Sequence, residues 1–497
     1  MSKIRVTYSG LINFVIGIIS VFTGLVFTLT VTRNLPQDEY GTWGLIGSLL
    51  VYATIISPIT DYWLTREIAR NQETGKTGIF STGIFSVIGF SIFVIISYFI
   101  AEKSDASFEI LLMGSILIPV LFLQKILHAI NMAWKPETRS YGMLIFETIK
   151  IPVGIYLIYF LNLGLVGAII TTFFAHLGEI VLLIFYAREK INVRFDICFL
   201  KKWFKLFWIP MYGNIQNFIL YLDVIFFTLI TGSVLGIAYY SVSLSVVAIV
   251  NHSSSISFAL YSKLLESGKK EYLQQNLINV LYFALPLLCI SIIFSKPALF
   301  ALNPLYVEAW PIVIILALKV FFHVIRDVFE SALLGVENVD VNENSTWKNF
   351  IKSKLFFMPT LRVIQNSVYV LIFSVVMIII TNQNFNDINL VIFWSMVGLS
   401  VQIPFTMYTY YLAKKKFSII LPKIKIIKYT FASVLIFGLM YYGFEKLVIY
   451  NENIFEFLPN LMIFVIVGML CYVLLTYLID LRTKYLIKSA IKEILKK

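Results

Sequence analysis

Residues 78–101 read GIFSTGIFSVIGFSIFVIISYFIA, a run without a single charged side chain. The hydrocarbon core of a bilayer is about 30 Å thick, and a helix needs about 20 apolar residues to cross it. The run is continuously apolar and lacks the roughly ten-residue alternation of an outer-membrane strand. It therefore predicts a transmembrane helix.

Similar runs recur along the whole chain of 497 residues, of which 59% are hydrophobic and 14% charged. Soluble proteins average about 45–50% apolar and about 25% charged residues. This composition, with a mean hydropathy of +0.84, excludes a soluble globule, a disordered chain and a nucleic-acid binder. We expect an all-α polytopic protein with fourteen spans, at approximately 8–31, 42–62, 78–101, 110–131, 141–161, 164–186, 208–230, 234–262, 275–295, 309–334, 355–381, 389–413, 427–449 and 458–480. The first run is too long for the apolar core of a signal peptide, so we expect it to remain as an anchor.

The distribution of basic residues predicts the orientation. Cytoplasmic loops of membrane proteins are enriched in Lys and Arg. With the amino terminus in the cytoplasm, 31 of the 40 Lys and Arg residues lie on the cytoplasmic side and five within spans. The opposite side holds only Arg33, Lys103, Lys296 and Lys446. We therefore expect a multi-pass protein of the cell membrane with both termini in the cytoplasm.

The connections suggest three parts: an amino-terminal lobe over 1–200, a second lobe over 201–413, and two further helices with a basic tail over 414–497. An even number of crossings gives both six-helix lobes the same orientation, as in transporters built from parallel repeats. The connection 187–207 mixes apolar and basic residues and predicts an amphipathic elbow that lies along the cytoplasmic interface. The tail 482–497 has the same pattern. For both segments, contact with anionic lipid is the simpler interpretation and binding of a specific partner the alternative.

Residues 32–70 carry a family resemblance. The segment reads TRNLPQDEYGTWGLIGSLLVYATIISPITDYWLTREIAR and resembles the start of Wzx-type polysaccharide-biosynthesis flippases, of the multidrug/oligosaccharidyl-lipid/polysaccharide exporter superfamily. The residues that match are Arg33, Leu35, Glu39, Tyr40, Gly41, Asp61 and Arg66, followed in the second lobe by Pro210, Asp223, Gly236 and Tyr240. The chain departs from the family at Asp61-Tyr62-Trp63-Leu64, where an Asp-x-Gly-Leu is usual. The resemblance implies two lobes that alternate access, with the last two helices beside the lipid tail of the cargo.

Charged residues within spans are candidates for function, because a charge in the hydrocarbon core costs about 2.5–3.5 kcal/mol on insertion scales. In the span 309–334, Lys319, His323, Arg326 and Glu330 fall on one helical face, with Asp327 beside them. We expect this face to line a polar cavity. The alternative is that Arg326, Asp327 and Glu330 pair with one another near the cytoplasmic interface.

Other spans carry further candidates. Lys150 is a candidate phosphate contact, although it lies three residues from Glu147 and also suits a structural ion pair. Arg362 has no acidic neighbour in its own span, which favours an anion contact. Lys125 and His128 lie towards the cytoplasmic end of their span. The simpler interpretation is that their side chains reach the membrane–water interface. His176 and Glu179 suit a buried pair or a proton-coupling site.

The two spans that open the second lobe are also polar. Gln216 shares a face with Tyr212 and Asp223, and Asn251 precedes His252 near mid-depth. We expect Gln216 and Asn251 to form a polar wall, or Asn251 to mark a discontinuity in its helix.

Three functions remain. A flippase for a polyprenyl-(pyro)phosphate-linked oligosaccharide needs cations for the phosphate and polar groups for the sugars: Lys319, Arg326, Arg362, Lys150, His323, Asn251 and Gln216 are the candidates. Asp61, Glu179 and Asp223 are candidates for coupling to H⁺ or Na⁺. A cation-coupled drug exporter of the same superfamily is the alternative, and a membrane glycosyltransferase or polymerase the third.

The remaining expectations are mostly absences. A membrane glycosyltransferase or polymerase needs a large outer loop with catalytic carboxylates. The predicted outer connections are too short for one, so we expect no enzyme activity. We also expect no cofactor and no nucleic-acid partner, and the scattered His and Cys residues predict no metal site. The expected partners are the bilayer, the lipid-linked oligosaccharide and glycan-assembly enzymes.

Overall fold

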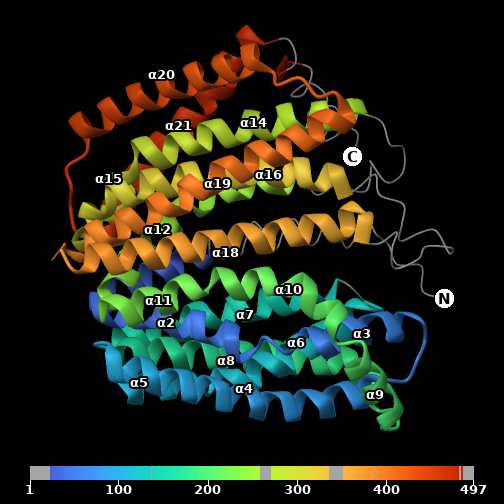
Figure 1. The fold of residues 1–497 in the computed structure, drawn as a ribbon. Helices are drawn as coiled ribbons and strands as arrows, with labels where there is room; N and C mark the ends of the chain where they lie inside the picture. The colour runs from blue at the N-terminus through green and yellow to red at the C-terminus, as the bar shows by residue number, and fades with distance from the viewer. Residues whose placement is uncertain are drawn as a thin grey trace. The chain divides into compact units, whose positions relative to one another are not determined.

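The computed structural model describes residues 23–135, 137–257, 270–334, 351–383, 385–480 and 483–484. Within these residues the chain is helical and contains no strand (Figure 1). The predicted all-α fold class is therefore confirmed, and the chain is a multi-pass membrane protein. Most of the first predicted span, and the amphipathic pattern of the tail, lie outside the described residues.

The chain divides into two compact units, described separately below. Unit 1 comprises Met1–Ser241 and Arg362–Leu390, and unit 2 comprises Val242–Leu361 and Val391–Lys497. Three helices cross from one unit to the other: α12 (Leu235–Asn251), α18 (Lys354–Thr381) and the first turn of α19 (Asp387–Phe417). The lobes inferred from the sequence, over 1–200, 201–413 and 414–497, stay a prediction.

From α4 onward, the long helices of unit 1 follow the predicted spans. They are α2 (Gln37–Ala53), α3 (Pro58–Ala69), α4 (Gly75–Lys103), α5 (Phe108–Gly114), α6 (Leu117–Met132), α7 (Thr138–Gly154), η1 (Ile155–Phe160), α8 (Gly164–Ile191), α9 (Ile197–Lys205), α10 (Trp208–Leu220) and α11 (Leu222–Thr231). Helices α6, α7 and α8 pack side by side, and α4 packs on α6 (Figure 1).

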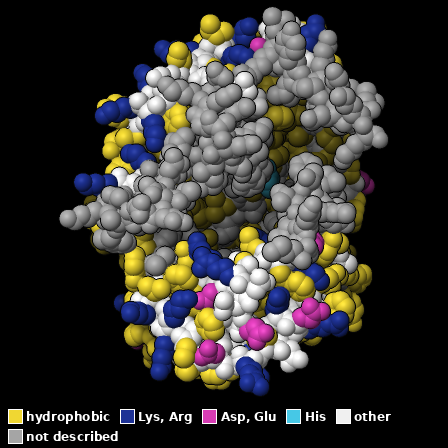
Figure 2. Space-filling model, turned by 90° about the vertical axis from the view of Figure 1, so that its right-hand side faces the viewer, with side chains coloured by type: hydrophobic (Ala, Val, Ile, Leu, Met, Phe, Trp, Pro, Cys, Tyr) yellow, Lys and Arg dark blue, Asp and Glu magenta, His cyan; other side chains and the backbone are white. Residues whose placement is uncertain are grey.

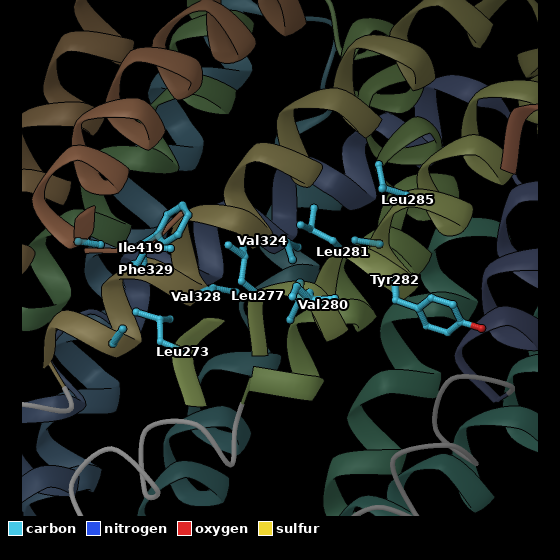
Figure 3. Packing of buried hydrophobic residues seen from close by; sticks show 14 of the residues in the cluster. Leu273, Leu277, Val280, Leu281, Tyr282, Leu285, Val324, Val328, Phe329 and Ile419 are labelled. Atoms are coloured by element: carbon cyan, nitrogen blue, oxygen red, sulfur yellow. The ribbon is translucent and has the colours of Figure 1, made fainter. Parts of the chain in front are cut away.

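Unit 2 is also built from long helices. They are η2 (His252–Ser257), α14 (Lys270–Ile293), α15 (Ser295–Leu302), η3 (Pro304–Ala309), α16 (Trp310–Leu334), α19 (Asp387–Phe417), α20 (Lys423–Leu447) and α21 (Ile454–Ile479). One of its apolar clusters joins α14 and α16, with Leu277, Leu281 and Val324 among its buried members (Figure 3).

Eleven helical segments of the described chain are long and apolar enough to cross a membrane, and the bent pair α2–α3 makes up to twelve. Helix α16 coincides with the predicted span 309–334 but is not among them, because Lys319, Arg326, Asp327 and Glu330 make it too polar by composition. The count of fourteen spans stays a prediction.

The predicted span 42–62 is broken. Helix α2 ends at Ala53, α3 begins at Pro58, and the two axes differ by 61°. Proline is favoured in the first turn of a helix, where its missing N–H would have no intrahelical acceptor. The prediction of one continuous helix over 42–62 is therefore wrong at this bend.

Two residues of the Glu39-Tyr40-Gly41 motif have structural roles. The Glu39 carboxylate accepts a hydrogen bond from the backbone N–H of Leu165, 2.7 Å away, at the start of α8. A carboxylate there satisfies a free backbone donor and complements the positive end of the helix dipole. Gly41 lies so close to the backbone carbonyl of Val234 that a Cβ atom would overlap it. The motif thus joins α2 to the starts of α8 and α12.

The elbow predicted at 187–207 contains the short helix α9, which is anchored to α3. The buried carboxylate of Glu67 accepts hydrogen bonds from Lys202 Nζ and Trp203 Nε1, each at 3.0 Å. Trp203 is fully buried, while Phe204 is exposed on the same helix. The lower half of Figure 2 shows Lys and Arg side chains interspersed with apolar ones on this side of unit 1. Contact between the elbow and anionic lipid stays a prediction.

We expect Glu67→Ala to loosen α9, because Trp203 Nε1 would lose its acceptor inside the protein. A buried donor left unpaired costs about 1–3 kcal/mol. Tryptic cleavage after Lys201 and Lys202, followed by mass spectrometry, should accelerate several-fold. The exposed Glu73 provides the control, and equal cleavage in Glu67→Ala and Glu73→Ala would contradict the anchoring role.

Polar contacts tie α21 to α14, and α20 to the end of α21. Pro286 has no N–H, so the carbonyl of Tyr282, four residues earlier, lacks its helical donor and instead accepts from Tyr472 Oη at 2.9 Å. Below α21, burial alone would raise the pKa of Asp480, but the hydrogen bond from Tyr429 and the nearby Lys425 hold it below its usual value. These contacts fix the last two helices within unit 2.

Candidate functional site

The most extensive polar cluster we find inside unit 1 surrounds Glu179. Its carboxylate lies 2.7 Å from Gln124 Nε2, 2.8 Å from His128 Nε2 and 3.3 Å from His176 Nδ1. Helix α6 supplies Gln124 and His128 at a spacing of four residues, and α8 supplies His176 and Glu179 at a spacing of three. Glu179 is only 2% exposed. Several donors thus stabilise one carboxylate far from solvent, as a buried charge requires.

The contacts of Glu179 bear on two expectations from the sequence, one for His128 and one for the pair of His176 and Glu179. The interpretation that His128 reaches the interface is wrong, since its imidazole points to Glu179 and is 22% exposed. The pair of His176 and Glu179 is present but is half of a larger group. Gln124 was missed, although its spacing from His128 places both on one face of α6.

Asp223 is held by hydrogen bonds in the first turn of α11. Its carboxylate accepts from Tyr369 Oη at 2.7 Å and from the backbone N–H of Val224 at 2.8 Å. The sequence singled out Asp223 but gave no partner for it, because Tyr369 lies 146 residues further on. Hydrogen bonds of this kind stabilise the ionised form of the side chain.

Asp61 lines a cavity of unit 1. The cavity has a volume of about 400 Å³ and lies where the first turn of α3 faces α10. Its walls are Pro58, Asp61, Tyr62, Pro210, Gly213 and Asn214. This volume falls within the range of small-molecule pockets, about 300–1,000 Å³. Of the three carboxylates proposed for ion coupling, Asp61 is the one that borders this cavity.

The charged face of α16 is largely paired within its own helix. Arg326 Nε lies 3.8 Å from Glu330 Oε2, and both side chains are buried. His323 Nε2 lies 3.5 Å from Asp327 Oδ2, with both side chains partly exposed. The alternative given above was that Arg326, Asp327 and Glu330 pair with one another. The distances favour that alternative for Arg326 and Glu330.

Lys319 lies one to two turns earlier on α16, against α19. A Cβ atom built on Gly398 would lie 3.0 Å from the Lys319 ammonium and 3.2 Å from two carbons of its chain. The glycine therefore makes room for the lysine between the two helices. Lys319 is partly exposed, as is Arg362 in α18.

Lys150 forms a close ion pair with Glu147, with 2.6 Å between Nζ and Oε2. Its ammonium also lies 4.9 Å and 5.2 Å from the ring centroids of Phe146 and Phe27. Both charged side chains are about 10% exposed or less. Of the two interpretations left open, the structural ion pair is the one that this geometry favours.

The polar residues of the next spans have different environments. The carbonyl of Gln216 accepts from Asn366 Nδ2 at 2.7 Å, and its side chain is partly exposed. Asn251 is exposed at the last position of α12, where the chain continues as the 3-10 helix η2. The predicted discontinuity at Asn251 is therefore present. In the described part of the chain, no group of three or more His, Cys, Asp or Glu residues is arranged to hold a metal ion.

These long apolar helices, with ionisable groups bonded inside them, define an all-α, multi-pass membrane protein. Comparison with solved structures identifies the fold more closely. The structure is similar to the lipid II flippase MurJ in an inward closed conformation, with a TM-score of 0.67 and 15% identity over 94% of this chain and 98% of that one. It is also similar to an inward-facing multidrug resistance MATE family transporter of the MOP superfamily, with a TM-score of 0.59 and 11% identity over 82% and 98%.

A third structure, of MATE in the straight conformation, gives a TM-score of 0.52 and 11% identity over 83% of this chain and 95% of that one. The chain thus has the fold of MOP-superfamily transporters. No protein-family model matches the sequence. No curated protein is significantly similar to it in sequence.

Proposed function

We propose that the protein is a flippase that moves a polyprenyl-(pyro)phosphate-linked oligosaccharide from the cytoplasmic to the outer leaflet by alternating access. The observation that carries this proposal is Lys319, an ammonium in the middle of α16 that packs against Gly398 of α19. From the sequence we expect α16 to span the membrane. A cation in this setting must face protein or a hydrated cavity. A phosphate on a lipid is the ligand that such a cation suits.

The fold supports the same proposal. A lipid II flippase is among the proteins with this fold, so the architecture is compatible with a lipid-carried cargo. The cation-coupled drug exporter stays the second candidate, because a multidrug resistance MATE transporter shares the fold as well. A cavity for cationic drugs favours carboxylates over Lys and Arg, and Lys319 and Arg362 argue against it. Coupling to H⁺ or Na⁺ through Asp61, Glu179 or Asp223 is part of the proposal.

We expect Lys319→Ala and Arg362→Ala each to slow transbilayer movement of a fluorescent lipid-linked oligosaccharide in proteoliposomes. A hydrogen bond to a charged group contributes about 1.5–3 kcal/mol, and 1.4 kcal/mol corresponds to a factor of ten. We therefore expect rates at least about tenfold lower, with unchanged amounts of folded protein. Lys103→Ala, at the exposed end of α4, is the matched control. Normal rates in both test variants would refute these two phosphate contacts.

A further inference from the structure

The cavity between α3 and α10 has walls of mixed character. Pro58 and Pro210 present rigid apolar rings near the starts of their helices, while Asp61, Tyr62 and Asn214 present polar groups. The Asn214 amide is oriented by its own hydrogen bond, from Nδ2 to the carbonyl of Pro210 at 2.8 Å. The Tyr62 ring is held under the guanidinium of Arg66, whose carbon lies 3.6 Å from the ring centroid. The site is thus built from side chains of defined orientation.

The charge of the cavity wall is balanced. Asp61 is the acidic residue of the lining, and it interacts electrostatically with Lys125 of α6. The Lys125 ammonium lies 3.4 Å from the Ser57 hydroxyl, just before α3. The nearby Lys125 partly offsets the charge of the Asp61 carboxylate and so weakens its attraction for an organic cation. The carboxylate still disfavours a phosphate in contact with it. The wall therefore favours a neutral ligand with many hydroxyl groups.

We propose that this cavity binds a sugar unit of the cargo. Sugar hydroxyls donate to the oxygens of Asp61 and Asn214 and accept from the Asn214 amide and the Tyr62 hydroxyl. The proline rings and the bare backbone of Gly213 offer an apolar surface to the C–H face of the ring. The proposal rests on the proposed function and assigns the sugar to a cavity of unit 1.

Gly213 allows a steric test. No atom lies within 4 Å of a Cβ atom built on it, so Gly213→Leu extends a side chain into the cavity without a clash at that atom. Gly83 of α4 is the matched control, because it is also an exposed helical glycine with nothing within 4 Å. Asp61→Ala provides a second test that removes the carboxylate.

Binding of the probes is measured by saturation-transfer NMR on the protein in lipid nanodiscs. Maltoside detergents are avoided, because they would themselves compete as sugars. The probes are neutral methyl glycosides of glucose, galactose and N-acetylglucosamine, with dodecyl phosphate and ethidium as the anionic and cationic probes. We expect at least one glycoside to receive saturation from the wild type and from Gly83→Leu. The signal should fall at least about tenfold in Gly213→Leu and Asp61→Ala, and ethidium should not displace the sugar.

The outcomes separate this inference from the proposed function. Absence of a glycoside signal in the wild type, an unchanged signal in Gly213→Leu, or displacement by ethidium would overturn the sugar site. Lys319→Ala should lower the saturation-transfer signal of dodecyl phosphate and leave the glycoside signal unchanged. A wild-type protein that neither binds dodecyl phosphate nor moves the lipid-linked oligosaccharide would instead overturn the proposed flippase function. Melting temperatures of all variants verify that each one is folded.

Discussion

Replacement of Glu179 by leucine is expected to lower the free energy of unfolding by about 3–5 kcal/mol, the cost typical of removing one partner from a buried ionic cluster. Gln124, His128 and His176 would each lose the oxygen that faces them. The effect should be measured as a shift of the unfolding midpoint in mixed micelles.

Two further variants separate this cause from a general effect of the substitution. Glu189→Leu changes an exposed glutamate of the same helix and should leave the midpoint nearly unchanged. Glu179→Leu combined with His128→Phe should recover part of the loss, because removing both partners of a polar contact costs less than removing one. Equal midpoints for Glu179→Leu and Glu189→Leu would show that the cluster contributes nothing to stability.

Gly41→Ala is expected to have the second large effect. The new methyl group would overlap the carbonyl of Val234, and backbone atoms on both sides leave no flexible side chain to move aside. Overpacking usually costs about 1–3 kcal/mol, and this contact belongs at the upper end of that range. We expect a lower melting temperature and a smaller yield of monodisperse protein.

Gly47→Ala is the matched control in the same helix. A Cβ atom on Gly47 meets nothing within 4 Å. In a helix interior, alanine is favoured over glycine by about 1 kcal/mol, so this variant should be as stable as the wild type or more stable. A Gly41→Ala protein that melts at the same temperature as Gly47→Ala would contradict the close approach of α2 to the start of α12.

The spans could be predicted from the sequence because their cause is local. Each needs only a run of apolar residues of sufficient length, and the helices from α4 to α21 follow those runs. The bend between α2 and α3 was missed because the residues around Thr54–Ser57 are as apolar as their neighbours. Pro58 was the available signal, since a proline in a helical run indicates a break or a kink.

Partners of polar side chains were predicted only within one helix. The pairs of Glu147 with Lys150, and of His176 with Glu179, follow from a spacing of three residues. The links from Glu179 to His128, from Asp223 to Tyr369 and from Glu67 to Trp203 join distant segments. These depend on which helices pack together, and periodicity in a single sequence carries no information about that.

The charged face of α16 shows the limit of helical-wheel reasoning. The wheel gathers Lys319, His323, Arg326 and Glu330 on one face, but it cannot say whether such a face binds a ligand or neutralises itself. The distances within the helix favour neutralisation for Arg326 with Glu330. The roles of Lys319 and Arg362 as phosphate contacts stay predictions.

The most direct test of the flippase proposal compares two cargoes in proteoliposomes made with the wild-type protein. One population contains a fluorescent polyprenyl-pyrophosphate oligosaccharide, and the other is assayed for transport of the organic cation ethidium under a proton or sodium gradient. The account predicts that the lipid-linked sugar crosses the bilayer faster than in protein-free liposomes, and that ethidium transport equals the protein-free rate. Gradient-driven ethidium transport without movement of the lipid-linked sugar would contradict it.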